Sequence, residues 1–172
     1  NDIFFTGTNL EQDKAQQIVR QALAGADDGE LFLEMRHSEM LAFDDGRLKS
    51  ASYDQSSGFG LRAIAGEAYG YAHAGELSEA ALRRAAASVG AVTKGYNGTA
   101  ALAPVAGSNR PLYDDGNPLN EMPFDAKVSL LQEIDAFARA ADPRVVQVSA
   151  SLAGSWQAVQ IKNAACKPKE KA

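Results

Sequence analysis

The sequence contains few of the residues that most often build catalytic or metal-binding sites. It has one cysteine, Cys166, and two histidines, His37 and His73, which are far apart in the chain. A single cysteine excludes an internal disulfide, and a zinc site needs three or four ligands from His, Cys and carboxylate side chains. We therefore expect no catalytic residue, metal site or cofactor site in this chain. The two histidines are predicted to be strand residues that make ordinary hydrogen bonds.

Long apolar runs and an excess of positive charge are also absent. No apolar run reaches the length of about 18 residues that a transmembrane helix needs. The first residues, NDIFFTGTNL, carry no basic signal-peptide region. The net charge of −5 disfavours binding to nucleic acid or to an anionic membrane. Together with the single cysteine, these features predict a cytoplasmic protein with no nucleic-acid or membrane partner.

Glycine is frequent in the stretch GFGLRAIAGEAYGYA, which runs from Gly58 to Ala72. A dinucleotide-binding loop would need a glycine at the position of Ala63, and a P-loop would need Lys after Gly66, where Glu67 stands. The residues instead alternate between two faces, and Ala65-Gly66 is placed for a tight turn. We predict a β-hairpin whose glycines allow another backbone or side chain to approach closely.

Five residues of this hairpin are candidates for a surface that faces a peptide or another domain: Gly58, Gly60, Arg62, Tyr69 and Tyr71. Arg62 shares a strand face with glycine and could meet a carboxylate or a peptide carbonyl, although most such arginines are solvated. The two tyrosines could simply pack on the sheet. The glycines could equally relieve crowding where a helix crosses the sheet.

Three pairs of neighbouring aspartates stand beside glycine: Asp27-Asp28, Asp44-Asp45 and Asp114-Asp115. Aspartate is favoured in turns because its side chain accepts hydrogen bonds from nearby backbone N–H groups. We therefore assign all three pairs to turns rather than to acid–base chemistry. Asp45-Gly46, between two alternating runs, predicts a type I′ hairpin turn.

Three helices are expected. Asn9 is predicted to cap the first, which ends near Gly25, and Ser78 to cap the second. Pro123 suits the first turn of a third helix that ends near Ala141. The buried stripe of this third helix is predicted to consist of Val128, Leu131, Ile134 or Asp135, Ala138 and Ala141.

Four to five strands are predicted between the first and second helices. The segments RVVQVSASLAG and SWQAVQI are predicted to form a final hairpin around Ala153-Gly154. The fold class is therefore α+β, with an antiparallel sheet of about five to seven strands and three helices packed on it.

Several spaced motifs resemble the N-terminal domain of the TldD/PmbA family of bacterial and archaeal metallopeptidases. These motifs occur in the family's order: a strand ending in a Ser-Glu pair, a DGR-K hairpin, GFGLRA, and ELS before a helix. PLYDDGNPL, the helix from Pro123 and VVQVSASLAGSW resemble the TldD branch. The resemblance implies a family domain over residues 1–161 and a polar tail outside the family over 162–172.

The resemblance also implies a cytoplasmic, zinc-dependent peptidase that degrades or matures small or unfolded peptides. Family members form a dimer, here with a TldE (PmbA)-like partner or a second copy. The family's zinc ligands lie in its second domain, in an H-E-x-x-x-H motif followed by a distant cysteine, and this sequence has no such motif. The implied role is a non-catalytic N-terminal domain, inactive alone, that shapes the substrate cavity and the dimer. The alternative is a stand-alone peptide- or protein-binding domain with no peptidase activity.

Overall fold

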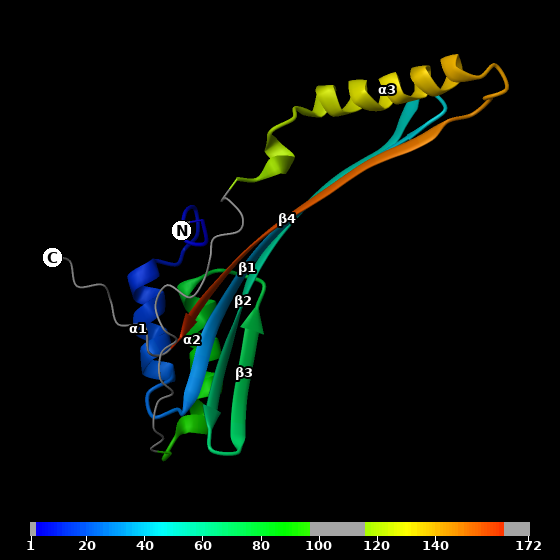
Figure 1. The fold of residues 1–172 in the computed structure, drawn as a ribbon. Helices are drawn as coiled ribbons and strands as arrows, with labels where there is room; N and C mark the ends of the chain where they lie inside the picture. Colours follow the sequence, from blue (N-terminus) through cyan, green and yellow to red (C-terminus); the bar gives the residue numbers. More distant parts are fainter. Residues whose placement is uncertain (1–2, 97–115, 164–172) are drawn as a thin grey trace. The chain divides into compact units, whose positions relative to one another are not determined.

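The computed structural model describes residues 3–96 and 116–163. Within these ranges the chain forms three α-helices, one 3₁₀ turn and four strands (Figure 1). In chain order, the elements are α1 (Gln12–Ala22), β1 (Asp28–Asp44), β2 (Arg47–Ala65), β3 (Ala68–Ala74), α2 (Glu79–Thr93), η1 (Pro118–Asn120), α3 (Phe124–Ala141) and β4 (Ser149–Asn163). None of the helices in the described residues combines the length and apolar character needed to cross a membrane.

The predicted α+β class is confirmed, but the predicted strand number is wrong. The described residues form one sheet of four strands in the order β3-β2-β1-β4. Fewer strands are found because three of them are long: β1 has 17 residues, β2 has 19 and β4 has 15. The β4 segment was expected to form a two-stranded hairpin, and the stretch from Gly58, which is part of β2, was expected to be a separate strand.

Gly154 illustrates the error, because no hairpin turn forms there. The residue lies inside β4, and its φ is not among the positive values found in the chain. A Cβ atom at this position would lie 2.5 Å from Cδ2 of Leu119. The glycine therefore provides space for a packed leucine rather than a turn.

The chain divides into two compact units. The first comprises Asn1–Met35, Ser57–Arg110 and Ala158–Ala172, and the second comprises Arg36–Ser56 and Pro111–Gln157. β1, β2 and β4 each contribute residues to both units.

In the first unit, α1 and α2 lie on one face of the strands (Figure 1). The alternating strand residues and the helical stripes meet there in one core, which includes Ile18, Val19, Leu31, Leu33, Phe59, Leu61, Ala63, Leu82 and Val89. The strand residues that alternate with these core residues point to the opposite face of the sheet. The core therefore leaves that second face of the hairpin available for other contacts.

The helix caps of the first unit are partly as predicted. Ser78 caps α2, since its Oγ accepts a hydrogen bond from the backbone N–H of Ala81 at 3.2 Å. Asn9 does not cap α1, whose N-cap is Glu11 and has no side-chain cap. Asn9 instead forms a parallel bridge with Ser78, and its carbonyl accepts from the N–H of Glu79 at 3.2 Å.

The turns follow from the glycine positions. Asp45 and Gly46 have φ values of 50° and 76°, which confirms a type I′ turn.

The turn between β2 and β3 is formed by Gly66, with φ of 61°, and Glu67. It lies one residue later than predicted. The backbone N–H of Gly66 donates to Oδ2 of Asp27 at 2.7 Å, so Asp27 stabilises the turn of a neighbouring hairpin. The third aspartate pair lies outside the described residues.

In the second unit, α3 packs on the strands through Leu131, which contacts Leu41 and Phe43. The helix ends at Ala141 as predicted, and Pro123 immediately precedes its first residue. The predicted buried stripe is partly wrong. The buried residues are Lys127, Leu131 and Asp135, a spacing of four that places them on one face, whereas Ile134 and Ala141 are exposed.

Candidate functional site

The β2–β3 hairpin brings most of the predicted site residues together. Its register pairs Arg62 with Tyr71, Gly60 with His73 and Ile64 with Tyr69. Directly opposed residues of antiparallel strands share one face of a sheet. We name the surface made by these side chains the hairpin face: Gly58, Gly60, Arg62, Tyr69, Tyr71 and His73.

The hairpin face lies opposite the core and presents a row of aromatic rings. Tyr69 is 75% exposed and Tyr71 is 59% exposed, so they do not pack into the core. The Tyr71 ring stacks on His73 with the ring centroids 5.7 Å apart. Sequence reasoning treated His73 as an ordinary strand residue, although its alternation with the two tyrosines could have placed it in this row.

Arg62 lies between two carboxylates of β1. Its Nη2 is 3.2 Å from Oε1 of Glu30 and 3.6 Å from Oδ2 of Asp28. All three side chains are between about a third and a half exposed, so these ion pairs contribute little to stability. A ligand carboxylate would compete with the two acids, whereas a ligand cation would gain from them.

The glycines of the hairpin have different structural roles. A Cβ at Gly58 would lie 2.8 Å from the backbone oxygen of Ala74, in the adjoining β3. A Cβ at Gly70 would lie 2.8 Å from Cγ2 of Val92 and 3.2 Å from the carbonyl oxygen of Val89. Gly58 therefore allows close strand pairing, and Gly70 relieves crowding where α2 crosses β3. At Gly60 the neighbour is Oη of Tyr71, at 2.9 Å, which is the end of a side chain that can move.

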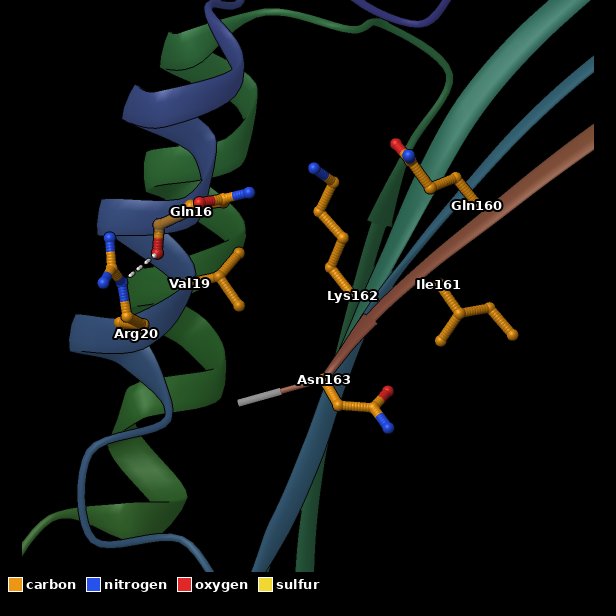
Figure 2. A pocket seen from close by; sticks show the side chains of 7 residues that line it. All are labelled: Gln16, Val19, Arg20, Gln160, Ile161, Lys162 and Asn163. Atoms are coloured by element: carbon orange, nitrogen blue, oxygen red, sulfur yellow. Dashed lines mark hydrogen bonds between the residues drawn. The ribbon is translucent and has the colours of Figure 1, made fainter. Parts of the chain in front are cut away.

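A small pocket lies between α1 and β4 in the same unit (Figure 2). Its volume is about 220 Å³, and it is lined by Gln16, Val19, Arg20, Gln160, Ile161, Lys162 and Asn163. Lys162 is buried, and its Nζ is 5.1 Å from the centroid of the Phe5 ring. Among the described residues, no partner is found for the buried Oε1 of Gln160 or Oδ1 of Asn163. The pocket therefore combines a cation with amide acceptors.

Sequence reasoning missed this pocket because Lys162 was assigned to the polar tail over residues 162–172. The strand β4 continues past the predicted boundary at residue 161 to Asn163. Figure 2 shows Lys162 directed toward α1, while Ile161 is directed away from it. This alternation continues that of the preceding β4 residues and was the available signal. The boundary itself stays a prediction.

His37 lies in the second unit and is occupied by hydrogen bonds. Its Nδ1 is 2.9 Å from Nδ2 of Asn117 and 3.2 Å from Oη of Tyr53. Oδ1 of Asn117 accepts from the N–H of Leu119 at 3.0 Å, so Nδ2 is the donor and Nδ1 of His37 is the acceptor. The predicted hydrogen bonding of this strand histidine is therefore confirmed for Nδ1, whereas no partner is found among the described residues for its buried Nε2.

The described residues do not fit a zinc ion. Across residues 3–96 and 116–163, no group of three or more His, Cys, Asp and Glu side chains could hold a metal. His37 and His73 belong to different units, and Cys166 lies outside the described residues. No metal chemistry is therefore derived from the described residues.

Two family models match consecutive parts of the chain. The model for PmbA/TldA metallopeptidase domain 1 matches residues 29–93, and the model for the PmbA/TldA metallopeptidase central domain matches residues 117–164. The metalloprotease TldD homologues of Buchnera aphidicola (subspecies Acyrthosiphon pisum) and Haemophilus influenzae are each 31% identical to the chain over 137 residues. Each match covers 78% of this chain and 28% of the relative. The chain thus spans less than a third of the length of these relatives.

Solved structures share the fold at low sequence identity. TldE from Thermococcus kodakarensis has a TM-score of 0.65 at 17% identity, covering 87% of this chain and 34% of that one. A candidate modulator of DNA gyrase from Bacteroides thetaiotaomicron has a TM-score of 0.59 at 15% identity, covering 88% of this chain and 36% of that one. The two family models matched in order, together with the curated relatives, show that the chain belongs to the TldD/PmbA family.

Proposed function

We propose that this chain is a non-catalytic N-terminal part of a TldD-like zinc metallopeptidase that degrades or matures small or unfolded peptides. One observation carries the proposal. The chain matches TldD homologues over 78% of its own length but covers only 28% of theirs. The absence of a metal-binding group among the described residues agrees with zinc ligands that lie in another part of the enzyme.

Within such an enzyme, the role of this chain is to shape the substrate cavity and the dimer. The partner is a TldE-like chain or a second copy, and the similarity to the TldE fold supports this choice. The enzyme works in the cytoplasm, as the composition of the chain suggested. These roles are proposed for the assembled protein, in which this chain is the non-catalytic part.

The hairpin face is the proposed peptide- or domain-facing surface. Its tyrosines are exposed, and β3 lies at an edge of the sheet. An edge strand can pair with an extended peptide through backbone hydrogen bonds, and neighbouring side chains then contribute specificity. The carboxylates beside Arg62 favour a peptide with an amino group or a basic side chain at this position.

The first experiment measures zinc and peptidase activity of the purified chain. After chelation and dialysis, elemental analysis should find no stoichiometric zinc, and an unfolded peptide should remain uncleaved. One tightly bound zinc per chain, lost in the double variant His37→Ala/His73→Ala, would overturn the proposal. The reading frame beyond codon 172 tests the stand-alone alternative, since an H-E-x-x-x-H motif there supports the peptidase and an unrelated gene does not.

The second experiment tests the hairpin face in the intact enzyme. Gly60→Val should cause a large loss of peptidase activity but only a small fall in the melting temperature, because the added methyls displace Tyr71 from its position. Arg62→Ala should strengthen binding of peptides with a basic side chain or an amino group at this position, because it removes the cation that competes for Asp28 and Glu30. If both variants keep full activity while Gly60→Val melts early, the face serves packing alone.

A further inference from the structure

The pocket between α1 and β4 is basic, although the chain as a whole is acidic. Two of its lining side chains, Arg20 and Lys162, carry a positive charge, and none of the seven lining residues is an acid. The net charge of the whole chain is −5. All of the lining residues belong to the first unit. A local excess of positive charge between the walls of a pocket attracts an anion.

Lys162 provides the buried charge of the pocket. The residue is 9% exposed, and its Nζ lies 5.1 Å from the centroid of the Phe5 ring, which is a cation–π contact. Phe5 itself packs against the core of the first unit, so the contact restricts where the ammonium group can move. Because the charge is shielded from water, it interacts more strongly with an anion than an exposed lysine does.

Arg20 stands at the outer rim of the pocket, where it is exposed. It follows Gln16 by one helical turn, and its Nε donates to the backbone carbonyl oxygen of Gln16 at 3.3 Å (Figure 2). Among the described residues, no hydrogen bond or ion pair is found for its two Nη groups. The guanidinium can therefore turn toward an anion that enters the pocket, and its planar donors suit a carboxylate.

Two amide oxygens give the pocket a second requirement. Oε1 of Gln160 and Oδ1 of Asn163 are buried, and neither has a hydrogen-bond partner among the described residues. A buried acceptor that finds no donor is unfavourable, so a ligand that donates an N–H here binds better than an anion alone. Gln160 and Lys162 are two residues apart in β4 and so lie on the same face of the strand. This wall fits a ligand whose anionic group and N–H donor are neighbours.

We propose that the pocket binds a carboxylate and an N–H group attached to the same carbon atom, as in a free amino acid or the C-terminal residue of a peptide. The carboxylate pairs with Lys162 and Arg20, and the N–H donates to Oε1 of Gln160. Buried Val19 provides an apolar wall for a small side chain. The proposal goes beyond the peptidase role and does not depend on it, since the hairpin face contributes no residue to the pocket.

The size of the pocket limits the ligand to one residue. Its volume of about 220 Å³ is below the range of about 300–1,000 Å³ that is usual for pockets that take larger ligands. Inorganic phosphate is small enough, but most of its surface consists of acceptor oxygens, which repel the two buried amide oxygens. Phosphate should therefore bind more weakly than an amino acid.

The test is a titration of the isotope-labelled 172-residue chain, followed through its backbone amide signals in NMR spectra. Alanine and N-acetylalanine carry both groups, so each should shift the signals of residues 16–20 and 160–163. N-acetylalaninamide lacks the carboxylate of N-acetylalanine, and propionate lacks the N–H groups of alanine. Each should bind at least about tenfold more weakly than the probe that it matches.

The same titration identifies the source of the ligand. A free amino acid offers an ammonium donor, whereas a peptide end offers an amide N–H. Tighter binding of alanine than of N-acetylalanine assigns the pocket to free amino acids, and tighter binding of N-acetylalanine assigns it to peptide ends. Both results support the proposal.

Two variants test the cation and the acceptor separately, without altering the contact between Lys162 and Phe5. Arg20→Met should weaken binding of every carboxylate probe by about three- to fivefold, as loss of an exposed ion pair does. Gln160→Met should remove the preference for alanine over propionate but leave propionate binding unchanged, which a purely structural role of Gln160 would not do. Lys14→Met is the matched control, because Lys14 lies in α1 but does not line the pocket. It should leave all dissociation constants unchanged.

Three results would overturn the proposal. In the first, none of the probes shifts the signals of the pocket residues. In the second, propionate binds as tightly as alanine, so the amide oxygens select nothing. In the third, inorganic phosphate binds more tightly than alanine and N-acetylalanine, which would make the pocket a site for anions in general.

Discussion

Lys127 of α3 and Glu39 of β1 form a buried ion pair. Nζ of Lys127 donates to Oε1 of Glu39 at 2.6 Å, to Oε2 at 2.9 Å and to the carbonyl oxygen of Leu119 at 2.7 Å. The ammonium group thereby uses all three of its donors. The two side chains are only 7% and 13% exposed, so each charge needs the other to offset the free-energy cost of its burial. This pair ties α3 and the preceding 3₁₀ turn to the strand beneath them.

The ion pair predicts a large cost for removing one partner. Lys127→Met should destabilise the chain by about 3–5 kcal/mol, because the carboxylate of Glu39 is left buried and uncompensated. The double variant Lys127→Met/Glu39→Met should be more stable than this single variant. Urea unfolding of the parent, the two single variants Lys127→Met and Glu39→Met, and the double variant measures the difference. A double variant that loses the sum of the two single losses would contradict the interpretation.

The type I′ turn predicts a cost that comes from the backbone alone. Gly46 has φ of 76°, and a Cβ added there would meet nothing within 4 Å. Gly46→Val should still cost about 1–3 kcal/mol, because a β-branched residue is strained at positive φ. Gly46→Asn should cost less, since asparagine tolerates this region. Equal losses for Val and Asn in denaturant would argue against the turn.

Two glycines of the hairpin should respond differently to the same substitution. Gly58→Ala forces its Cβ against the backbone oxygen of Ala74, 2.8 Å away, and should cost about 1–3 kcal/mol, as overpacking does. Gly60→Ala meets only the Tyr71 side chain, which is exposed and can rotate away, so the loss should be small. Thermal melting of both variants compares them directly. A larger loss at Gly60 than at Gly58 would show that the Tyr71 ring is held more firmly than its exposure suggests.

The hydrogen bond between Tyr96 and Asp27 predicts an alkaline dependence of stability. The Tyr96 hydroxyl donates to Oδ2 of Asp27 at 2.7 Å, and this bond, followed by desolvation, raises the pKa of Tyr96 above its ordinary value of 10.0. A pKa raised in the folded state stabilises the fold below pH 10.0, and this contribution is lost as the pH rises through the folded value.

Tyr96→Phe should therefore unfold more readily than the parent at neutral pH, and the difference between the two should shrink in alkaline solution. Urea midpoints measured across the alkaline range test this. Asp27→Asn also changes the carboxylate whose hydrogen bond raises the Tyr96 pKa, but it changes the bond to Gly66 as well. The phenylalanine variant is therefore the cleaner one. A constant difference at all pH values would show that the hydrogen bond does not control the titration.

Much of the local structure was predictable from the sequence because its causes are local. Asp45-Gly46 adopts positive φ in both residues, which few other dipeptides accept. Ser78 caps α2 through a hydroxyl three residues before the N–H that it satisfies. The alternating residues around Leu31 and Leu61 lie on the buried face of two strands, so this pattern also has a local cause. The family resemblance was also predictable, because it depends on the order of short motifs along the chain.

The tertiary structure decided what depends on residues far apart in the chain. Gly154 marks no turn because Leu119 occupies the space beside it, so β4 remains one strand. From the sequence, Arg62 could face solvent, a carboxylate or a peptide carbonyl, and the structure places it between acids of β1. Lys127 is buried because Glu39, 88 residues earlier, neutralises it. A sequence pattern records the propensities of neighbouring residues, whereas burial of a charge or a glycine depends on which distant side chain fills the space beside it.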